Sequence, residues 1–354
     1  MTYHIPTLPL TQDIMTTALW SKLVATNRAV AELKGVAHTI PNQSLLINTL
    51  AIQESKDSSE IESIVTTHDE LFRFDKNNPD RFSPAAKEVY RHNESLHYGF
   101  EQIKKRPITS TLLIDIVQIT TQNKAGFRNA PGTTLKNPRT GEIVYTPPQD
   151  HNEIVKHMTN LEQFINDPAV SNIDPLVKMA IIHHQFESIH PFFDGNGRTG
   201  RILNILYLIQ EDILEIPILY LSRYITQNKA EYYRLLQAVR DDGAWSEWIL
   251  FMLDALGSTA RQTIIMIEEI KTLMMEYKKI IRSDTKIYSH ELINNLFHHP
   301  YTKIEYVMED VGVSRITATK YLNQLVETGL LEMQKSGKTH YYINTKLVRL
   351  FTNL

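Results

Sequence analysis

The chain has 354 residues, of which 42% are hydrophobic and 22% charged, with a formal net charge of −3. This length favours two or three folding units, and the charge balance gives no sign of a surface that binds nucleic acid as a whole. Because the sequence has no cysteine, no signal-like N-terminal segment and no run of 18 apolar residues, it excludes disulfides and thiolate metal sites, and we expect a cytoplasmic protein without a membrane span.

Apolar residues recur at helical spacing along most of the chain up to about residue 283. One interruption, residues 126–148, is rich in Pro and Gly and contains the strand-like run 142–146, so we expect a short hairpin there. Beyond residue 283 the pattern predicts three short helices, at 289–297, 303–310 and 314–327, and then strands at 330–335 and 339–343, which is the order of a winged helix. The longer helices are expected at residues 14–33, 45–52, 84–100, 109–122, 152–165, 175–184, 202–209, 224–240, 244–256 and 261–279.

Residues 190–201, HPFFDGNGRTGR, combine the groups that a phosphate-binding site needs. We expect Gly-Asn-Gly at 195–197 to adopt positive φ and to turn its N–H groups inward, as an anion nest at the start of a helix. Arg198 and Arg201 are three residues apart, so they share one helix face and can hold a polyphosphate. Asp194 can bind Mg²⁺, and His190 can take a proton from an attacking hydroxyl because it titrates near neutrality.

This segment resembles the Fic family motif, HxFx(D/E)GNGRxxR, and matches it at every fixed position. The resemblance implies a mainly helical bundle with a small β-hairpin flap, and transfer of AMP from ATP to Ser, Thr or Tyr hydroxyls of proteins. It also implies that His190 is the general base and that Asp194 is the Mg²⁺ ligand. Gly197 stands where the Doc-type phosphotransferases of this superfamily carry Lys, which favours nucleotidyl over phosphoryl transfer. The nucleotide-binding residues implied in the motif are Gly195, Asn196, Gly197, Arg198, Thr199, Gly200 and Arg201.

Two further segments resemble parts of the substrate site in this family. The hairpin at 139–147, with Ile143, Val144 and Tyr145, is similar to the flap that pairs with an extended target segment through its backbone edge. Tyr233 lies in a stretch that resembles the lining of the adenine pocket, and its ring can stack on a purine. The alternative for the hairpin is a surface hairpin without a partner. The alternative for Tyr233 is ordinary helix packing.

Residues 58–63, SSEIES, predict a built-in inhibitor of the site. Ser58 and Glu62 are four residues apart on one helix face, and they match the motif [S/T]xxxE[G/N] of Fic proteins with an N-terminal inhibitory helix. Ser63 departs from the usual Gly or Asn, which puts the turn after Glu62 in doubt. We expect Glu62 to pair with Arg201 and to compete with the γ-phosphate, although an accidental match on a solvated helix and a role for Glu62 in removing AMP both stay open.

The predicted fold class is therefore mainly α: a Fic-type helical bundle with a small β-hairpin flap, plus a C-terminal winged helix-turn-helix. We expect an N-terminal helical region with the inhibitory helix at residues 1–82 and a Fic catalytic core at 83–256. A linker helix at 257–283 and a winged-helix domain at 284–354 complete the expected organisation.

The C-terminal segment resembles a DNA reader, because residues 311–349 carry six Lys or Arg against two Asp or Glu. Arg315 and Lys320 would lie on its recognition helix, and Lys335, Lys338 and His340 would line its wing. A dimerisation or target-docking module of the same fold is the alternative.

Three functions stay open for the whole chain. One is an autoinhibited adenylyltransferase that uses ATP and Mg²⁺ on a protein target, itself included. The second is a DNA-binding regulator whose Fic core only senses nucleotide, and the third is a Fic transferase that uses another nucleotide or phosphocholine donor. The intact His190 favours a transferase, because a sensor needs no general base. A homodimer is implied by the family alone.

Overall fold

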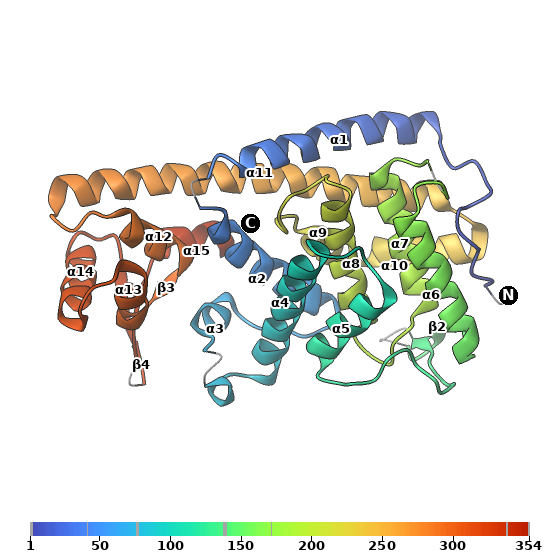
Figure 1. Cartoon of the computed structure of the whole chain (residues 1–354), viewed down its shortest axis with the longest axis horizontal. Helices are drawn as coiled ribbons and strands as arrows, with labels where there is room; N and C mark the ends of the chain where they lie inside the picture. The colour runs from blue at the N-terminus through green and yellow to red at the C-terminus, as the bar shows by residue number, and fades with distance from the viewer. Residues whose placement is uncertain are drawn as a thin grey trace.

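The computed structural model describes residues 3–40, 42–75, 78–136, 140–170, 172–337 and 339–352, and these residues form a mainly helical chain (Figure 1). The predicted mainly helical class is confirmed: the helices carry two small antiparallel sheets. Within the described ranges no helix is both long and apolar enough to cross a membrane. The helices and strands are α1 (Thr17–Ala37), α2 (Gln43–Ile61), α3 (His68–Arg73), a 3₁₀ turn (Pro79–Arg81), α4 (Pro84–Ile103), α5 (Ser110–Thr121), β1 (Leu135–Lys136), β2 (Ile143–Tyr145), α6 (His151–Asn166), α7 (Pro175–Ile189), α8 (Asn196–Gln210), α9 (Leu221–Gln227), α10 (Lys229–Asp242), α11 (Trp245–Asp284), α12 (His290–His298), β3 (Tyr301–Thr302), α13 (Ile304–Val311), α14 (Arg315–Glu327), β4 (Glu332–Ser336), β5 (Thr339–Ile343) and α15 (Thr345–Thr352).

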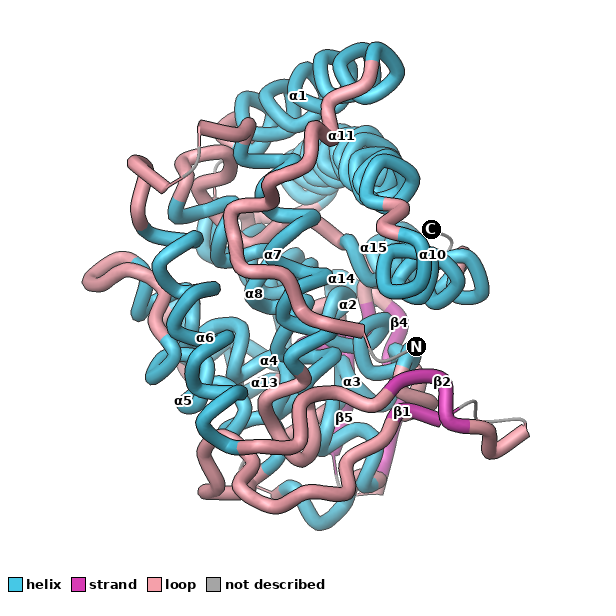
Figure 2. The backbone as a smooth tube through the Cα atoms, turned by 90° about the vertical axis from the view of Figure 1, so that its right-hand side faces the viewer, coloured by secondary structure: helices cyan, strands magenta, loops and turns pink. Residues whose placement is uncertain are grey.

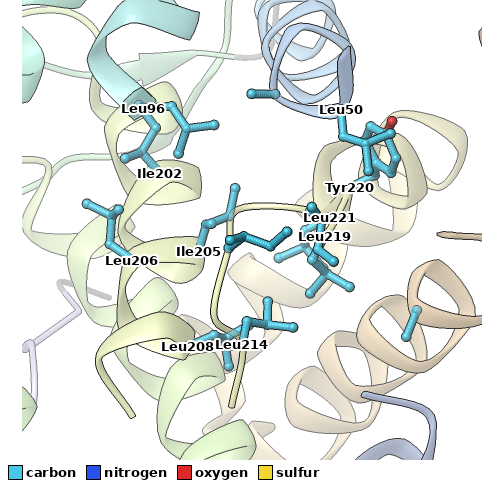
Figure 3. Close-up of a cluster of buried hydrophobic side chains, with 14 of the residues drawn as sticks. Leu50, Leu96, Ile202, Ile205, Leu206, Leu208, Leu214, Leu219, Tyr220 and Leu221 are labelled. Atoms are coloured by element: carbon cyan, nitrogen blue, oxygen red, sulfur yellow. The ribbon is translucent and has the colours of Figure 1, made fainter. Parts of the chain in front are cut away.

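Helices α7 and α8 form the centre of the core. Every residue of α7 from Leu176 to Ile189 is buried, and α8 is buried along almost its whole length. A helix that is buried on all sides must be enclosed by others, and α2, α4, α5, α6 and α11 pack against this pair. Figure 3 shows Ile202 of α8 beside Leu96 of α4, and Leu50 of α2 beside Tyr220, which follows α8 in the chain. The loop between α7 and α8 is therefore anchored at both ends by the best-packed part of the molecule.

Helix α11 is longer than the sequence pattern predicts. The expected helices at 244–256 and 261–279 are one continuous helix of 40 residues, so the expected linker at 257–283 is the second half of a helix that begins in the core. Helix α1 packs along α11 (Figure 1). A Cβ atom at Gly257 would lie 3.4 Å from Thr26 Oγ1 of α1, so this glycine allows the two helices to approach closely without breaking α11.

The C-terminal module, residues 285–352, has the element order of a winged helix. Helices α12, α13 and α14 are followed by β4 and β5, and the three-stranded sheet has the order β3-β5-β4. The three helices and two strands predicted after residue 283 are thus present. The short strand β3 and the last helix α15 were not predicted, because β3 depends on pairing with β5 and α15 depends on packing against α11.

The C-terminal module docks on α3, the short helix that follows the predicted inhibitory motif. The rings of Phe72 and Tyr301 stack with centroids 5.9 Å apart, and the Tyr301 hydroxyl donates a hydrogen bond of 2.7 Å to Asp69. Arg73 donates a bond of 2.5 Å to Gln334 on β4. One strand of the wing is therefore held by the N-terminal region.

Strands β1 and β2 form the predicted hairpin (Figure 2). Its first strand, Leu135–Lys136, precedes the expected span of 139–147, and Arg139 lies outside the described residues. The pairing is antiparallel, with Leu135 opposite Tyr145.

Candidate active site

The loop that joins α7 to α8 takes its shape from two left-handed residues. His190 ends α7 with φ 48°, and Gly195 precedes α8 with φ 79°. We expected positive φ at all of 195–197, but Asn196 and Gly197 already belong to α8. The first hydrogen bond inside α8 runs from Thr199 N–H to Gly195 O, at 2.9 Å. The backbone N–H groups before Thr199 therefore lie at the helix N-terminus, the end that favours anions.

The side chain of Asn196 closes this loop. Its Oδ1 accepts a hydrogen bond of 2.8 Å from Phe192 N–H, and its Nδ2 donates one of 2.7 Å to Phe192 O. The side chain is thus committed to the loop, and Asn196 can offer a phosphate its backbone N–H. Gly195 N–H bonds Asp194 Oδ1 at 2.7 Å, while 72% of the Asp194 side chain is exposed.

The two glycines inside α8 are required by close packing rather than by positive φ. A Cβ atom on Gly197 would collide with Glu62 Oε1 and would lie 2.9 Å from Arg201 Nη1. A Cβ atom on Gly200 would lie 2.8 Å from Glu187 Oε1 on α7. Gly197 therefore leaves room for the side chains of Glu62 and Arg201, whereas Gly200 leaves room for α7.

Arg201 is fully buried, and α2 supplies all the acceptors that its guanidinium has among the described residues. Nε donates to Ser58 Oγ at 2.8 Å, and Nη2 donates to Ser58 O at 2.8 Å and to Glu62 Oε1 at 3.0 Å. The predicted pairing of Glu62 with Arg201 is therefore present. Burial favours the neutral form of Glu62, but the charge and hydrogen bond of Arg201, together with the charge of Arg198, outweigh it and hold the pKa of this carboxyl below its ordinary value.

Arg198 is held by a carboxylate that the sequence analysis missed. Its Nη1 donates a hydrogen bond of 2.5 Å to Glu88 Oε1 on α4, and its Nη2 lies 3.6 Å from Asp194 Oδ1. The expected neighbours in the motif, Arg198 and Asp194, are thus brought together, but Glu88 makes the closer contact. No feature of the sequence pattern singled out Glu88 among the acidic residues of α4.

His190 is neutral near pH 7. Burial and the positive charges of Arg128 and Arg240 lower its pKa from 6.5 to about 4. Its Nδ1 is buried and has no hydrogen-bond partner within the described ranges. Arg128, which the sequence analysis also missed, donates from Nε to His190 O at 2.8 Å and fixes the backbone at this point.

Glu187 is a second carboxyl group behind the loop. It lies one turn before His190 on α7, is buried, and carries an Oε1 atom without a hydrogen-bond partner among the residues described. Burial raises the pKa of Glu187 to about 7, although Arg201 acts in the opposite sense. Burial thus favours the neutral form of this carboxyl group.

The hairpin presents two of its three predicted target-binding residues. Ile143 is 54% exposed and Val144 49% exposed. Tyr145 is instead buried, with its hydroxyl donating to Ser188 O at 2.8 Å and its ring centroid 3.9 Å from the Arg240 guanidinium carbon. The Tyr145 side chain therefore does not face solvent: it anchors the flap, because its hydroxyl needs a partner inside the core.

The two tyrosines at the start of α10 have different environments. Tyr232 is buried and its hydroxyl lies 2.8 Å from His183 Nε2, so it belongs to the core. Tyr233 is 46% exposed. Burial of its hydroxyl and the nearby charge of Glu62 raise the pKa of Tyr233 above its ordinary value. The predicted nucleotide contact therefore lies on the same side of the molecule as the Glu62–Arg201 pair.

A histidine before a tight loop, the N-terminus of a buried helix and two arginines on that helix together define a Fic-type site. Family descriptions match the chain in three segments: "Fic/DOC family N-terminal" over residues 20–101, "Fic/DOC family" over 107–208, and "Protein adenylyltransferase SoFic-like, C-terminal domain" over 273–347. The chain belongs to the Fic/DOC family.

Curated relatives match over a short part of their length. Protein adenylyltransferase fic-1 of Caenorhabditis elegans is 32% identical over 85 residues, which are 23% of this chain and 15% of that protein. Protein adenylyltransferase Fic of Drosophila erecta is 28% identical over 102 residues, which are 29% of this chain and 19% of that protein. The matches thus span less than a fifth of these relatives.

Solved structures match over much more of the chain. A Fic family protein from Desulfovibrio desulfuricans has a TM-score of 0.60 at 19% identity, and the match covers 93% of this chain and 96% of that one. A Fic domain containing signaling protein from Bacteroides thetaiotaomicron has a TM-score of 0.54 at 17% identity, over 72% of this chain and 97% of that one. At these identities the likeness is one of fold.

Proposed function

We propose that this chain transfers AMP from ATP to a Ser, Thr or Tyr hydroxyl of a protein target, including hydroxyls of the chain itself. The observation that carries the proposal is the neutral, half-buried imidazole of His190 beside the N-terminus of α8, the end of a helix that favours anions. A neutral imidazole can accept the proton of an attacking hydroxyl, and a nearby anion site can hold the phosphates that the hydroxyl attacks. The names of the curated relatives support AMP as the transferred group.

The residues around the loop fit a magnesium nucleotide. Arg198 and Arg201 would hold the β- and γ-phosphates, and backbone N–H groups at the start of α8 would hold the rest. Within the described ranges no three acidic or histidine side chains gather as a metal site. The single exposed carboxylate of Asp194 suits Mg²⁺, which binds through one or two carboxylates, phosphate oxygens and water. When bound, Mg²⁺ neutralises charge on the phosphates.

Glu62 acts in this proposal as an inhibitor of nucleotide binding. Its carboxylate takes the Arg201 Nη2 donor that a γ-phosphate would use. Glu62 caps α2, and Ser63 directly after it has φ 66°, a left-handed conformation that is unfavourable for serine. A carboxylate at a helix end beside a strained residue can move away more easily than one inside a helix.

The target would bind at the outer edge of the flap. Pairing with the backbone of β2 needs no particular target sequence, and the exposed Ile143 and Val144 add apolar contact. Tyr145 keeps the strand fixed beside Ser188, two residues before His190. A hydroxyl on a strand paired with β2 would therefore be presented near the base.

The test is transfer of label from ATP to protein in the presence of Mg²⁺. We expect label from the α-phosphate but not from the γ-phosphate, more label with Glu62→Gly than with the wild type, and none when His190→Ala is added. Glu60→Gly is the matched control, because Glu60 lies on the same helix but pairs with Lys56. Label from the γ-phosphate, or undiminished label after His190→Ala, would overturn the proposal. Labelled GTP, CTP, UTP and CDP-choline, run in parallel, test the other donors.

DNA binding through the C-terminal module is the second candidate function. Its support is the exposed face of α14, where Arg315, Ile316 and Lys320 point away from the core. Arg315 is engaged in an ion pair of 2.8 Å with Glu305, and Lys338 of the wing lies outside the described residues. Loss of a DNA mobility shift in Arg315→Glu and Lys320→Glu variants would support this function, and no shift by the wild type would contradict it. A homodimer and a cytoplasmic location stay predictions, the first testable by sedimentation.

A further inference from the structure

Arg198 lies between two carboxylates that it contacts through different nitrogens. The guanidinium is almost fully buried, with 3% of its side chain exposed. Nη1 bonds Glu88 at 2.5 Å, Nη2 lies 3.6 Å from Asp194, and Nε has no hydrogen-bond partner in the described part of the chain. Nη1 is thus held by a hydrogen bond, Nη2 has only a distant carboxylate, and Nε is unpaired among the described residues.

Glu88 is well placed to stay where it is when other groups move. It lies inside the first turns of α4, whose N-terminus is capped by Ser83 Oγ accepting from Ala86 N–H. Helix α4 packs against α2, α5 and α8. Glu62, in contrast, lies at the end of its helix. A carboxylate inside the hydrogen-bonded turns of a packed helix is suited to holding a partner in place, whereas one at a helix end can move away more easily.

We propose that Glu88 is a positioning residue for the magnesium nucleotide, an assignment that rests on the proposed function. It holds Arg198 through Nη1, so that Nη2 and Nε remain for a phosphate. By supplying the main negative partner of Arg198, it also leaves the Asp194 carboxylate available for Mg²⁺.

The effect of Glu88 on Asp194 follows from the cost in free energy of a buried charge without a partner. A guanidinium in this environment needs a carboxylate beside it. Asp194 is four residues before Arg198 on the loop and helix, and it is the other carboxylate in contact with this guanidinium. Without Glu88, we expect Arg198 to pair closely with Asp194. A carboxylate engaged in that way binds a metal ion less well, and the arginine no longer points toward the phosphates.

The experiment measures ATP binding by calorimetry as Mg²⁺ is varied, in full-length protein that carries Glu62→Gly and His190→Ala. The first change removes the inhibitor, and the second prevents transfer. We expect Glu88→Ala to raise the Mg²⁺ concentration for half-maximal ATP binding about tenfold, which corresponds to about 1.4 kcal/mol. Glu88→Gln keeps an acceptor without the charge and should give a smaller shift. Glu94→Ala, an exposed glutamate on the same helix, is the matched control and should give none.

A measurement without metal separates the effect of Glu88 on Arg198 from its effect on Asp194 and Mg²⁺. In EDTA, Glu88→Ala should still weaken ADP binding, because Arg198 has lost its fixed partner, but by less than the loss of ATP binding at low Mg²⁺. An unchanged Mg²⁺ midpoint would overturn the assignment alone, and tighter ATP binding would show Glu88 to be a second inhibitor instead. If the parent protein binds no nucleotide at all, the proposed function is wrong, and the assignment of Glu88 is wrong with it.

Discussion

The Glu62 carboxylate lies 3.0 Å from Arg201 Nη2, across a gap of 139 residues in the sequence. The same guanidinium donates two bonds of 2.8 Å to Ser58, one to its hydroxyl and one to its backbone oxygen. Helix α2 therefore supplies one charged and two neutral acceptors to a single buried arginine. The neutral pair can hold Arg201 in place while the charged acceptor exchanges with a phosphate.

Replacing Glu62 with glutamine tests whether charge is what excludes the nucleotide. Glu62→Gln should bind ATP more tightly, by roughly tenfold, since the amide competes poorly with a phosphate for Arg201. The protein without nucleotide should lose about 1–3 kcal/mol of stability, because a buried charge loses its partner. Thermal melts with and without MgATP measure both effects, and Glu60→Gln is the control. An ATP-induced shift in Tm no larger than that of the wild type would contradict the prediction.

Ser63 is the position at which the inhibitory motif departs from its usual Gly or Asn. Its φ of 66° is a conformation that costs an L-residue about 1–2 kcal/mol relative to glycine. Ser63→Gly should therefore stabilise the folded protein by up to about 1 kcal/mol, offset in part by the greater freedom of glycine in the unfolded chain. Chemical denaturation measures the change. Ser63→Ala keeps the strain and should bring no gain, and equal stability of both variants would show that the turn is not strained.

The flap can be altered without touching the nucleotide site. Ser in place of both Ile143 and Val144 should reduce labelling of a protein target severalfold and leave ATP affinity unchanged, because these side chains face solvent. Tyr145→Phe should reduce labelling by loosening the flap, since it removes the 2.8 Å bond to Ser188 O. Labelling assays and calorimetry separate the two readouts. A matching fall in ATP affinity for the Ile143 and Val144 variant would contradict the assignment.

The sequence predicted the parts of the site that depend on short-range spacing. His190, Asp194 and the two arginines lie within one segment of twelve residues, and the Glu62–Arg201 pair could be inferred because each partner sits in its own motif. The hairpin and the helices after residue 283 could be predicted for the same reason. In each of these cases local periodicity or a motif carried the information.

The groups that the sequence did not reveal depend on tertiary packing. Glu88 reaches Arg198 only because α4 packs beside α8, and Arg128 reaches His190 O from an irregular segment without periodicity. The burial of Tyr145 follows two exposed residues on β2, and a three-residue strand gives too short a pattern for the sequence to reveal it. The break expected between helices at 244–256 and 261–279 is absent, because Gly257 packs closely on α1 and stays inside α11. None of these relations can be read from the spacing of residues in one segment.

Docking of the C-terminal module on α3 can be tested by removing its aromatic contact. Phe72→Ala should cost about 2–3 kcal/mol at this interface, because the ring packs on Tyr301 and also approaches Phe351. Faster hydrogen exchange in β4, β5 and α3, with no change in α7 and α8, is the expected outcome. Arg73→Ala should produce a smaller change in the same segments. Unaltered exchange in β4 and β5 would mean that the contacts of the module with α11 and α2 hold it without α3.

Glu54, on α2, makes the stability of the folded protein depend on pH. Its carboxyl is fully buried and hydrogen-bonds Ser222, through Oε2 with Ser222 N–H at 3.1 Å and through Oε1 with the Ser222 hydroxyl. Burial raises the pKa of Glu54 to about 8, against 4.5 in its ordinary state, although the bonds to Ser222 act in the opposite sense. The folded protein therefore holds a proton near pH 7 that the unfolded chain releases.

The sign of the effect follows from this difference in bound protons. The contribution of Glu54 to stability is present in full below about pH 4.5 and is lost as the pH rises through about 8. Glu54→Gln carries no proton, so it should match the wild type near pH 5 and be the more stable protein at pH 8.5. Glu60→Gln on the same helix should show no such difference between the two pH values. Denaturant unfolding at both pH values measures the effect, and a constant gap between the Glu54→Gln variant and the wild type would show that Glu54 is ionised in the folded state at pH 7.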